Sequence, residues 1–206
     1  EIITFDKNTT DSVGNLPVAS ENTLSGLTLH LSSKTPTRTN YVFKEWNTQP
    51  NGSGTTYHPD DNITLDPEID NSMVLYAQWK VSVFNIIYDA NGGDGVMDST
   101  TYKYTNKQEG NSFDLPYASN YSRTGYGFVG FSPEQIDPTD TTTYPTSADV
   151  VDAVNDLAAD GLIFGPNAYV TLPTGFADYA DNTTRIVKLY AVWLPSQGNL
   201  QGWTIS

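Results

Sequence analysis

Two pentapeptides decide the fold: residues 75–79 are Leu75-Tyr76-Ala77-Gln78-Trp79, and residues 189–193 are Leu189-Tyr190-Ala191-Val192-Trp193. A segment that returns with a single change far along the chain indicates an internal repeat, and such repeats are whole structural units. The alternation of side chains predicts a β-strand in which residues 75, 77 and 79 lie on the face opposite residues 76 and 78.

Two more blocks repeat in the same order. Residues 3–8 (Ile-Thr-Phe-Asp-Lys-Asn) match residues 86–91 (Ile-Ile-Tyr-Asp-Ala-Asn), and residues 37–46 match residues 122–131. Three blocks found twice in a fixed order predict two copies of one module. The motif residues are Asp6, Arg38, Tyr41, Phe43, Trp46, Leu75, Tyr76 and Trp79 in the first copy, and Asp89, Gly92, Gly93, Arg123, Gly125, Tyr126, Phe128, Phe131, Leu189, Tyr190 and Trp193 in the second.

The spacing of the blocks predicts the domain boundaries. Trp46 and Leu75 are 29 positions apart, whereas Phe131 and Leu189 are 58 apart, so the second copy carries about 29 extra residues. We expect a first module at 1–79, a short linker at 80–83, and a second module at 84–193 with its insertion within 132–188. The tail 194–206 is either an extra edge strand or the start of a next element.

The fold class that we predict is mainly β (α+β), with two small modules in tandem. Residues 41, 43 and 45 should form one face of a central strand and residues 42, 44 and 46 the other. Asn91-Gly92-Gly93 predicts a hairpin turn, because these residues tolerate positive φ.

One helix is expected inside the insertion, near residues 147–160. Thr146 to Asp149 offers an N-cap with an acid in the first turn, and Gly161 fits the C-terminal stop. Helical spacing places Val150, Val154, Leu157 and Ala158 on one face.

The three blocks together resemble the Listeria–Bacteroides repeat, the B-repeat type of internalins and other bacterial surface proteins. The second copy carries Asp89 to Gly93, then Arg123 to Phe131, then Leu189 to Trp193; the first copy has Thr9-Thr10 and Asn40 in place of glycines. The resemblance implies β-grasp-like modules strung in tandem on a cell surface, with roles in spacing, adhesion or contact with host molecules. It implies no catalytic residues.

Composition excludes several functions. The net charge of −14 repels phosphate backbones and anionic membranes, so we expect no nucleic-acid partner. No apolar run of about 18 residues occurs, which argues against membrane insertion. The absence of Cys fits an exported bacterial protein, and the start at Glu1 suggests a segment of a larger parent protein with adjacent domains.

The repeated aromatic residues have two interpretations. Core and cross-strand packing is the first. The second is a sugar-stacking platform, which would make the chain a carbohydrate-binding module of a secreted enzyme and needs several rings on one exposed face. Arg38 and Arg123, at one repeat position, are expected to fix a loop by pairing with an acid or a carbonyl.

Acidic loop residues raise a metal hypothesis. Asp60, Asp61, Asp66 and Asp70 supply oxygen ligands of the kind that Ca²⁺ prefers, but their spacing does not match an EF-hand, and a solvated acidic loop is the alternative. No other cofactor is indicated. An intramolecular isopeptide bond from Lys44, Lys80 or Lys188 to an Asn stays open, by analogy with other surface domains.

Catalysis has little support in the sequence. The only histidines are His30, expected to point outward from a strand, and His58, expected in a turn, and no motif of a hydrolase or metalloprotease occurs. We therefore expect a non-catalytic, extracellular module that acts as an adhesin stalk, a spacer or a protein-interaction module. Its partner would be a host or bacterial surface protein or a glycan.

Overall fold

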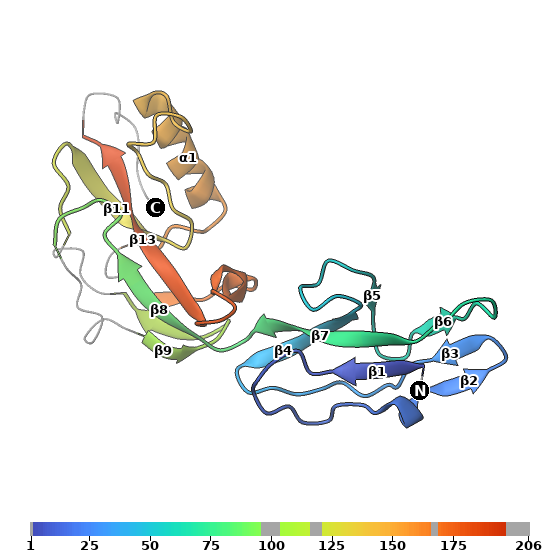
Figure 1. Ribbon diagram of the computed structural model, residues 1–206. Helices are drawn as coiled ribbons and strands as arrows, with labels where there is room; N and C mark the ends of the chain where they lie inside the picture. Colours follow the sequence, from blue (N-terminus) through green and yellow to red (C-terminus); the bar gives the residue numbers. More distant parts are fainter. Residues whose placement is uncertain (1, 96–103, 116–120, 166–168, 197–206) are drawn as a thin grey trace. The chain divides into compact units, whose positions relative to one another are not determined.

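The computed structural model describes residues 2–95, 104–115, 121–165 and 169–196 (Figure 1). The chain divides into two compact units, residues 1–82 and 83–206. Lys80 and Val81, which we had placed in a linker, extend the last strand of the first unit. Leu194 and Pro195 likewise end a strand of the second unit, and residues 197–206 of the expected tail lie outside the described residues.

The first unit is built from two small sheets. The larger has the order β1-β7-β4-β5, with β1 (Ile3–Asp6), β4 (Tyr41–Asn47), β5 (Thr56–Tyr57) and β7 (Met73–Val81). Its first and last strands, β1 and β7, are parallel neighbours, and the other pairs are antiparallel. The smaller sheet contains β2 (Thr23–Ser25), β3 (Thr28–His30) and β6 (Asn62–Thr64), and a 3-10 turn, η1, covers Ala19–Glu21.

The two sheets of the first unit share one core. Leu29 and Ile63 from the smaller sheet pack in one cluster with Ile3, Trp46 and Leu75 from the larger. Each fully buried aliphatic side chain of this kind stabilises the fold by about 1.5–3 kcal/mol. Leu75 and Ala77 of β7 are fully buried, whereas Tyr76 and Gln78 are half-buried, so the two faces that the alternation predicted do differ in burial.

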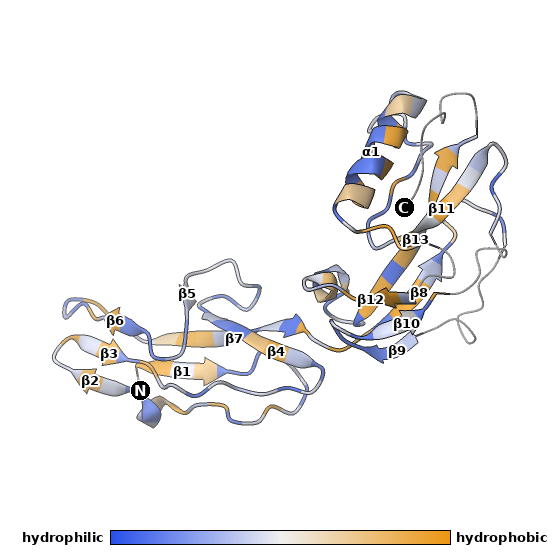
Figure 2. Ribbon diagram, turned by 180° about the vertical axis from the view of Figure 1, so that it is seen from behind, coloured by the Kyte–Doolittle hydropathy of each residue, from blue (hydrophilic) through white to orange (hydrophobic). Residues whose placement is uncertain are grey.

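The second unit repeats the main sheet of the first, with its parallel first and last strands and a third strand antiparallel to the last. We call this shared arrangement the frame. Its main sheet has the order β11-β13-β8-β9, with β8 (Phe84–Asp89), β9 (Tyr104–Lys107), β11 (Tyr126–Ser132) and β13 (Ile186–Pro195). The first strand, β8, and the last, β13, are again parallel, and β11 is antiparallel to β13. Strands β10 (Ser112–Asp114) and β12 (Tyr169–Thr171) form a two-stranded sheet, and a 3-10 turn, η3, covers Phe176–Tyr179. In Figure 2, β1 of the first unit and β13 of the second carry much of the hydrophobic colour.

A β-bulge occurs at the same place in both units, and it corrects one prediction. The register between β4 and β7 shifts between Phe43 and Glu45, and the register between β11 and β13 shifts between Phe128 and Gly130. The extra residue brings Phe43 and Trp46 to one side, with ring centroids 4.8 Å apart. The predicted strict alternation over residues 41–46 was therefore wrong, because a bulge resets the two-residue period.

The turn at residues 90–93 forms, but it does not join two paired strands directly. Asn91 and Gly92 have φ of 47° and 77°, and the Gly93 N–H donates to the Ala90 carbonyl at 2.9 Å. Asp94 then pairs with Ser122, and the chain returns antiparallel to β8 only as β9. The local turn chemistry was predictable, whereas the strand that follows depends on distant partners.

The helix prediction is confirmed as α1 (Ser147–Ala159), with Thr146 as N-cap. Val150, Val154 and Leu157 are buried, whereas Ala158 is exposed, contrary to expectation, because it lies beyond the edge of the buried stripe. Together with Val129, Ile136, Val192 and Leu194 they form a separate core cluster against the sheet.

Most of the extra residues fall between β11 and the point where the chain returns to it. Eleven positions separate Trp46 from Tyr57, its neighbour on β5, but 33 separate Phe131 from Phe164, its equivalent partner. Gly130 permits this return, because a β-carbon there would lie 2.5 Å from the Phe164 carbonyl oxygen. The first unit has Glu45 at this position.

Candidate functional site

An asparagine after the first strand joins the ends of each module. The Asn8 side-chain amide donates to the Pro50 and Ala77 carbonyls at 2.8 and 2.9 Å. Asn91 donates in the same way to the Ile136 and Ala191 carbonyls at 2.8 and 3.0 Å. Ala77 and Ala191 are the central residues of the two pentapeptides, so this asparagine links the start of each module to its last strand. We call this pair of contacts the asparagine lock.

The aspartate two residues earlier completes the lock. The Asp6 carboxylate accepts the Asn8 backbone N–H at 2.7 Å, and the Asp89 carboxylate accepts the Asn91 N–H at 2.8 Å. Asn8 and Asn91 both have positive φ, which asparagine tolerates better than most residues. The aspartates are among the predicted motif residues, whereas the asparagines are not, although the recurrence of Asp-x-Asn in the two copies identifies them.

The last aromatic residue of each pentapeptide bonds to the same turn. The Trp79 indole N–H donates to the Lys7 carbonyl, and that of Trp193 donates to the Ala90 carbonyl, both at 2.9 Å. The indole N–H of each tryptophan is therefore satisfied by a hydrogen bond within its own module.

The repeated arginines also hold a loop. Arg38 donates from Nε to Asp11 Oδ2 at 2.8 Å, and its guanidinium lies 3.6 Å from the centre of the Tyr41 ring. Arg123 donates to the Asn91 carbonyl at 2.9 Å and lies over the Tyr126 ring at 4.7 Å. Arg38 thus pairs with a carboxylate, whereas Arg123 bonds a carbonyl and also lies 4.0 Å from the Asp137 carboxylate.

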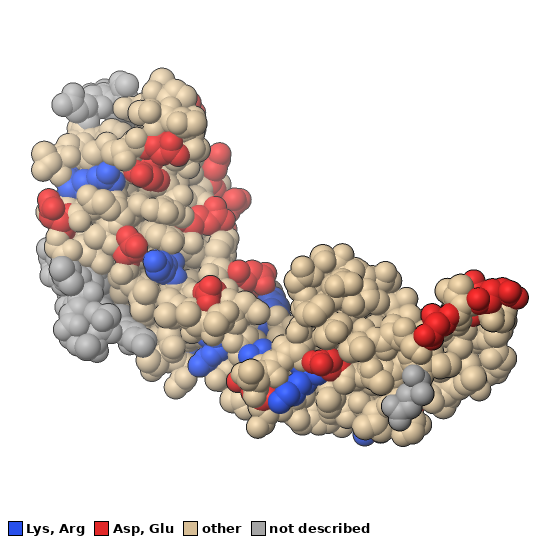
Figure 3. Space-filling model, viewed as in Figure 1, with Lys and Arg blue, Asp and Glu red and all other residues tan. Residues whose placement is uncertain are grey.

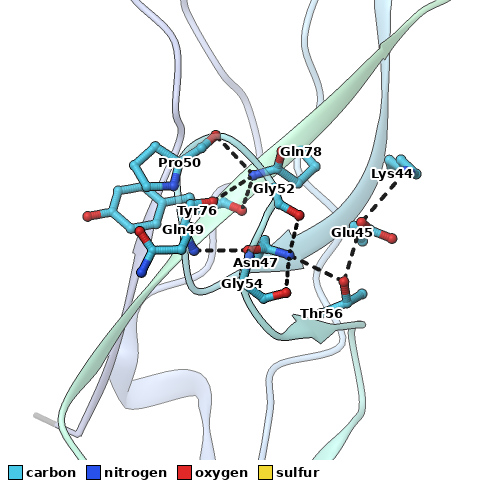
Figure 4. A network of polar contacts seen from close by, with 10 residues as sticks. All are labelled: Lys44, Glu45, Asn47, Gln49, Pro50, Gly52, Gly54, Thr56, Tyr76 and Gln78. Atoms are coloured by element: carbon cyan, nitrogen blue, oxygen red, sulfur yellow. Dashed lines mark hydrogen bonds and ion pairs between the residues drawn. The ribbon is translucent and has the colours of Figure 1, made fainter.

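Asn47 organises the loop between β4 and β5 of the first unit (Figure 4). It is fully buried, donates to the Gly52 and Gly54 carbonyls at 3.2 Å, and accepts the Gln49 and Gly54 backbone N–H groups at 2.9 Å. Gln78 of β7 also donates to the Gln49 and Pro50 carbonyls. The backbone of the whole loop is therefore held by one side-chain amide, that of Asn47. No sequence pattern predicted this role.

The repeated aromatic rings pack into the modules. Trp46, Phe131 and Trp193 are at most 1% exposed, and Tyr41 is 9% exposed. None of the ten falls in the exposed class, and several contact each other at ring-centroid distances near 5 to 6 Å: Tyr41, Phe43, Trp46, Tyr76, Trp79, Tyr126, Phe128, Phe131, Tyr190 and Trp193.

Three of the four acidic candidates for a metal accept hydrogen bonds from their own loop, and the fourth, Asp60, contacts a histidine of β3. Asp61 accepts the His58 N–H at 2.6 Å, Asp66 accepts the Glu68 N–H at 2.8 Å, and Asp70 accepts the Ser72 N–H at 2.9 Å. Asp60 lies 3.4 Å from the ring of the exposed His30. Within the described ranges, no group of three His, Cys, Asp or Glu residues is arranged to hold a metal ion. The bond to the Ser72 N–H and then that to its hydroxyl hold the pKa of Asp70 below its ordinary value.

Charge is distributed unevenly over the visible surface. Figure 3 shows acidic side chains gathered over α1 in the second unit and beyond β6 in the first. Of the lysines considered for an isopeptide bond, Lys44 is exposed and lies 3.7 Å from the Glu45 carboxylate, and Lys188 is also exposed.

A groove of about 550 Å³ opens on the second unit. Its floor contains Ile186, Lys188 and Tyr190 of β13, which alternate with the buried Val187 and Leu189. Further along this face, Val192 and Leu194 are covered by α1. The groove is therefore the part of the sheet face that the helix leaves open.

The walls of the groove come from the second copy's extra residues. Pro133 begins the long connection from β11 and lines one wall. The other wall is formed by Tyr179, the last residue of η3, and by residues 180, 181 and 184 after it. The Tyr179 hydroxyl donates to Glu134 Oε1 at 2.9 Å and so ties the two walls together. Burial, and then this contact with the Glu134 carboxylate, raise the pKa of Tyr179.

The wall segment is anchored at both ends. Glu109 accepts the Gly175 and Ala177 N–H groups at 2.9 and 3.1 Å. The Asp181 carboxylate accepts the Thr184 N–H at 2.7 Å and its hydroxyl at 2.9 Å. The bonds to Thr184, and then to Thr183, lower the pKa of Asp181. Because these residues lie in stretches that do not repeat, sequence comparison of the two copies gave no signal for the groove.

Two β modules in tandem, with their recurring residues engaged in internal contacts, define a class of repeat protein. The Listeria-Bacteroides repeat domain matches residues 2–78 and 84–159, and the chain belongs to this family of bacterial surface-protein repeats. The second match ends at the last residue of α1 and does not reach β13, which the insertion separates from the rest of its module.

One relative extends the comparison. A protein of Evansella cellulosilytica described as a Gly-rich membrane protein is 38% identical over 58 residues, which is 28% of this chain and 6% of that protein. No solved structure matches the chain. Among the described residues, no helix has the length and apolar character needed to cross a membrane.

Proposed function

We propose that this chain is a non-catalytic, extracellular spacer segment of a bacterial surface-anchored or secreted protein, of the kind found in adhesin stalks. The observation that supports it most is the pair of asparagine locks, at Asn8 and Asn91. What the two modules share are contacts that connect the first strand, the turn and the last strand. Repetition of a frame, rather than of an open site, is what a spacer needs.

The strand arrangement supports a β-grasp-like architecture for both modules. In each, the first and last strands are parallel neighbours and a third strand is antiparallel to the last. A frame whose terminal strands are paired side by side resists pulling at its ends, because the ladder between them must shear before either strand leaves.

The interaction role falls to the second module in this proposal. A host or bacterial surface protein or a glycan would contact the residues that the first module lacks, while adjacent domains of the parent protein are held apart by both. The alternative, a carbohydrate-binding module built on the repeated rings, is less well supported, because those rings are buried or half-buried against each other.

Force spectroscopy of the whole chain, held at its two ends, tests the spacer role. We expect two separate unfolding events, each releasing a length set by about 3.3–3.6 Å for every residue of one module. A matched variant, Asn8→Ala, should lower the force of the shorter event alone. A single event for the whole chain, or unfolding below the force that extends an unstructured linker, would contradict the proposal.

A further inference from the structure

We propose that the groove on the second module, lined by Tyr179, Tyr190 and Asp181, binds an arginine side chain of an extended basic segment of a partner protein. The proposal rests on the interaction role proposed above for the second module and names the chemistry of the partner. It is independent of the spacer role, because none of the groove residues takes part in the asparagine lock.

Both modules already hold an arginine of their own over a tyrosine ring and beside a carboxylate. In the first module, Arg38 lies 3.6 Å from the centre of the Tyr41 ring and donates to Asp11 at 2.8 Å. In the second module, Arg123 lies 4.7 Å from the centre of the Tyr126 ring, with a carboxylate 4.0 Å away. A planar guanidinium can stack on an aromatic face and pair with a carboxylate at the same time, which a lysine ammonium does less well.

The groove offers the same two kinds of partner. Tyr179 and Tyr190 line it, and the Tyr179 hydroxyl donates to the Glu134 carboxylate at 2.9 Å. Arg185 is not among the lining residues, and it donates instead to the Val83 carbonyl at 2.8 Å. None of the described residues that line the groove is an arginine, so these rings and carboxylates are available to an arginine of another protein.

The charge around the groove favours a cation. Four carboxylates lie at or near the wall that η3 begins: Glu134, Asp160, Asp178 and Asp181. Burial and then Glu134 raise the pKa of Tyr179, and the charges of Asp160 and Asp178 raise it further. Among the described residues that line the groove, Lys188 is the one basic side chain, and it opposes a cationic ligand. The carboxylates outnumber it, so the potential at this wall is negative and attracts a guanidinium.

The build of the groove suits an extended segment that is held by its side chains. Its volume of about 550 Å³ has room for a few side chains. Strand β13 of the floor is paired on both sides, with β11 and β8, so a peptide cannot add to the sheet there through its main chain. The walls are held before binding, by the Tyr179–Glu134 bond and by the bonds from Gly175 and Ala177 to Glu109, so little conformational entropy is lost when a ligand enters.

Calorimetric titration of the whole chain tests the proposal with three capped peptides: tetra-arginine, tetralysine and tetracitrulline. Tetra-arginine should bind with a Kd of about 1 mM or tighter. Tetralysine should bind about threefold more weakly, and tetracitrulline, in which a neutral urea group replaces the guanidinium, about tenfold more weakly. Amide NMR shifts caused by tetra-arginine should centre on residues 179–190.

Matched acid and ring variants locate the site. Glu134→Gln keeps an acceptor for the Tyr179 hydroxyl but removes the charge, and it should weaken binding about threefold, whereas Glu68→Gln, at an exposed glutamate of the first module, should leave it unchanged. Tyr190→Leu should weaken binding about threefold by removing a ring, and Tyr76→Leu, at the equivalent position of the first module, should not.

A lysine variant should have the opposite sign. Lys188→Gln removes a like charge from the groove and should tighten binding of tetra-arginine about twofold, whereas Lys44→Gln, at an exposed lysine of the first module, should change nothing. Equal thermal unfolding of the variants and the parent chain would verify that they fold.

Three outcomes would overturn the proposal: no binding of tetra-arginine at millimolar concentration, equal binding of tetralysine and tetra-arginine, or equal weakening by Glu134→Gln and Glu68→Gln. The last would mean general attraction to an acidic protein. Shifts centred on α1 would overturn the groove and leave the interaction role of the second module standing, and none of these outcomes bears on the force experiment.

Discussion

Replacing Asn91 by alanine should destabilise the second module by about 3 kcal/mol. The side chain is 5% exposed and supplies the donor for two carbonyls, those of Ile136 and Ala191. Each lost bond costs about 1 kcal/mol, and more where the carbonyl stays buried without a partner. Alanine at a φ of 47° adds about 1 kcal/mol of backbone strain.

Asn106 provides the matched control. It has a similar φ of 52°, but its side chain is exposed and donates no hydrogen bond to the described residues. Asn106→Ala should therefore cost only the backbone strain, about 1 kcal/mol. Asn91→Gly measures the other contribution. Glycine adopts positive φ freely, so this variant loses the side-chain hydrogen bonds without adding backbone strain.

Hydrogen exchange of the intact chain, read by mass spectrometry, measures each module separately. For Asn91→Ala we expect faster exchange in the strands of residues 84–195 and unchanged exchange in residues 2–82. The reasoning is refuted if Asn91→Ala and Asn106→Ala cost the same within about 0.5 kcal/mol, a resolution typical of additivity tests. It is also refuted if the first module loses protection equally.

Three further predictions concern other parts of the two modules. Trp46→Phe, which introduces the residue of the second module, should cost under about 1 kcal/mol in urea unfolding, because the buried indole N–H has no partner, whereas Trp79→Phe should cost about 1–3 kcal/mol by leaving a carbonyl without its donor. Gly130→Ala should destabilise the second module by about 2–4 kcal/mol in thermal unfolding, since its β-carbon would meet a carbonyl oxygen at 2.5 Å, and Gly127→Ala, with open space, should be nearly neutral. The first turn of α1 should lose exchange protection as the pH falls below about 3.9. Hydrogen bonds from the N-cap Thr146 hold the pKa of Asp149 below its ordinary value, and they stabilise the helix only while that carboxylate is charged. Asp149→Asn should abolish this pH dependence.

The parts of the fold that the sequence predicted are those with a local signal. Period-two alternation predicted the two faces of β7, and a cap, an apolar stripe and a glycine predicted α1 almost to the residue. The two copies, confirmed by the family match, followed from repetition alone. The bulge between Phe43 and Glu45 was missed, because a bulge is decided by the register of two strands and leaves no mark in one of them.

The groove was beyond prediction for a related reason. Tyr179 and Glu134 are 45 positions apart and neither recurs in the first copy, so nothing in the chain indicated that they bond. The recurring aromatic residues suggested a sugar-stacking platform, yet the structure shows that these residues pack inside the modules and hold the frame. In a tandem repeat, a groove that only one copy forms is better sought where the copies differ.

The position of the insertion explains how the second copy could gain a helix and a groove and still keep the frame. Lengthening the connection from 11 to 33 positions costs only about 1 kcal/mol of loop-closure entropy, since that cost grows with the logarithm of length. The added segment brings Val150, Val154 and Leu157 to cover Val192 and Leu194, so it buries its own apolar surface against the outer face of β13. The lock at Asn91 contacts this segment through the Ile136 carbonyl, in the place that the Pro50 carbonyl takes in the first module, and through the Gln135 side chain, which donates to Asn91 Oδ1 at 2.9 Å. Because the frame needs only a carbonyl there, the chain beyond it is free to become a helix and a groove wall.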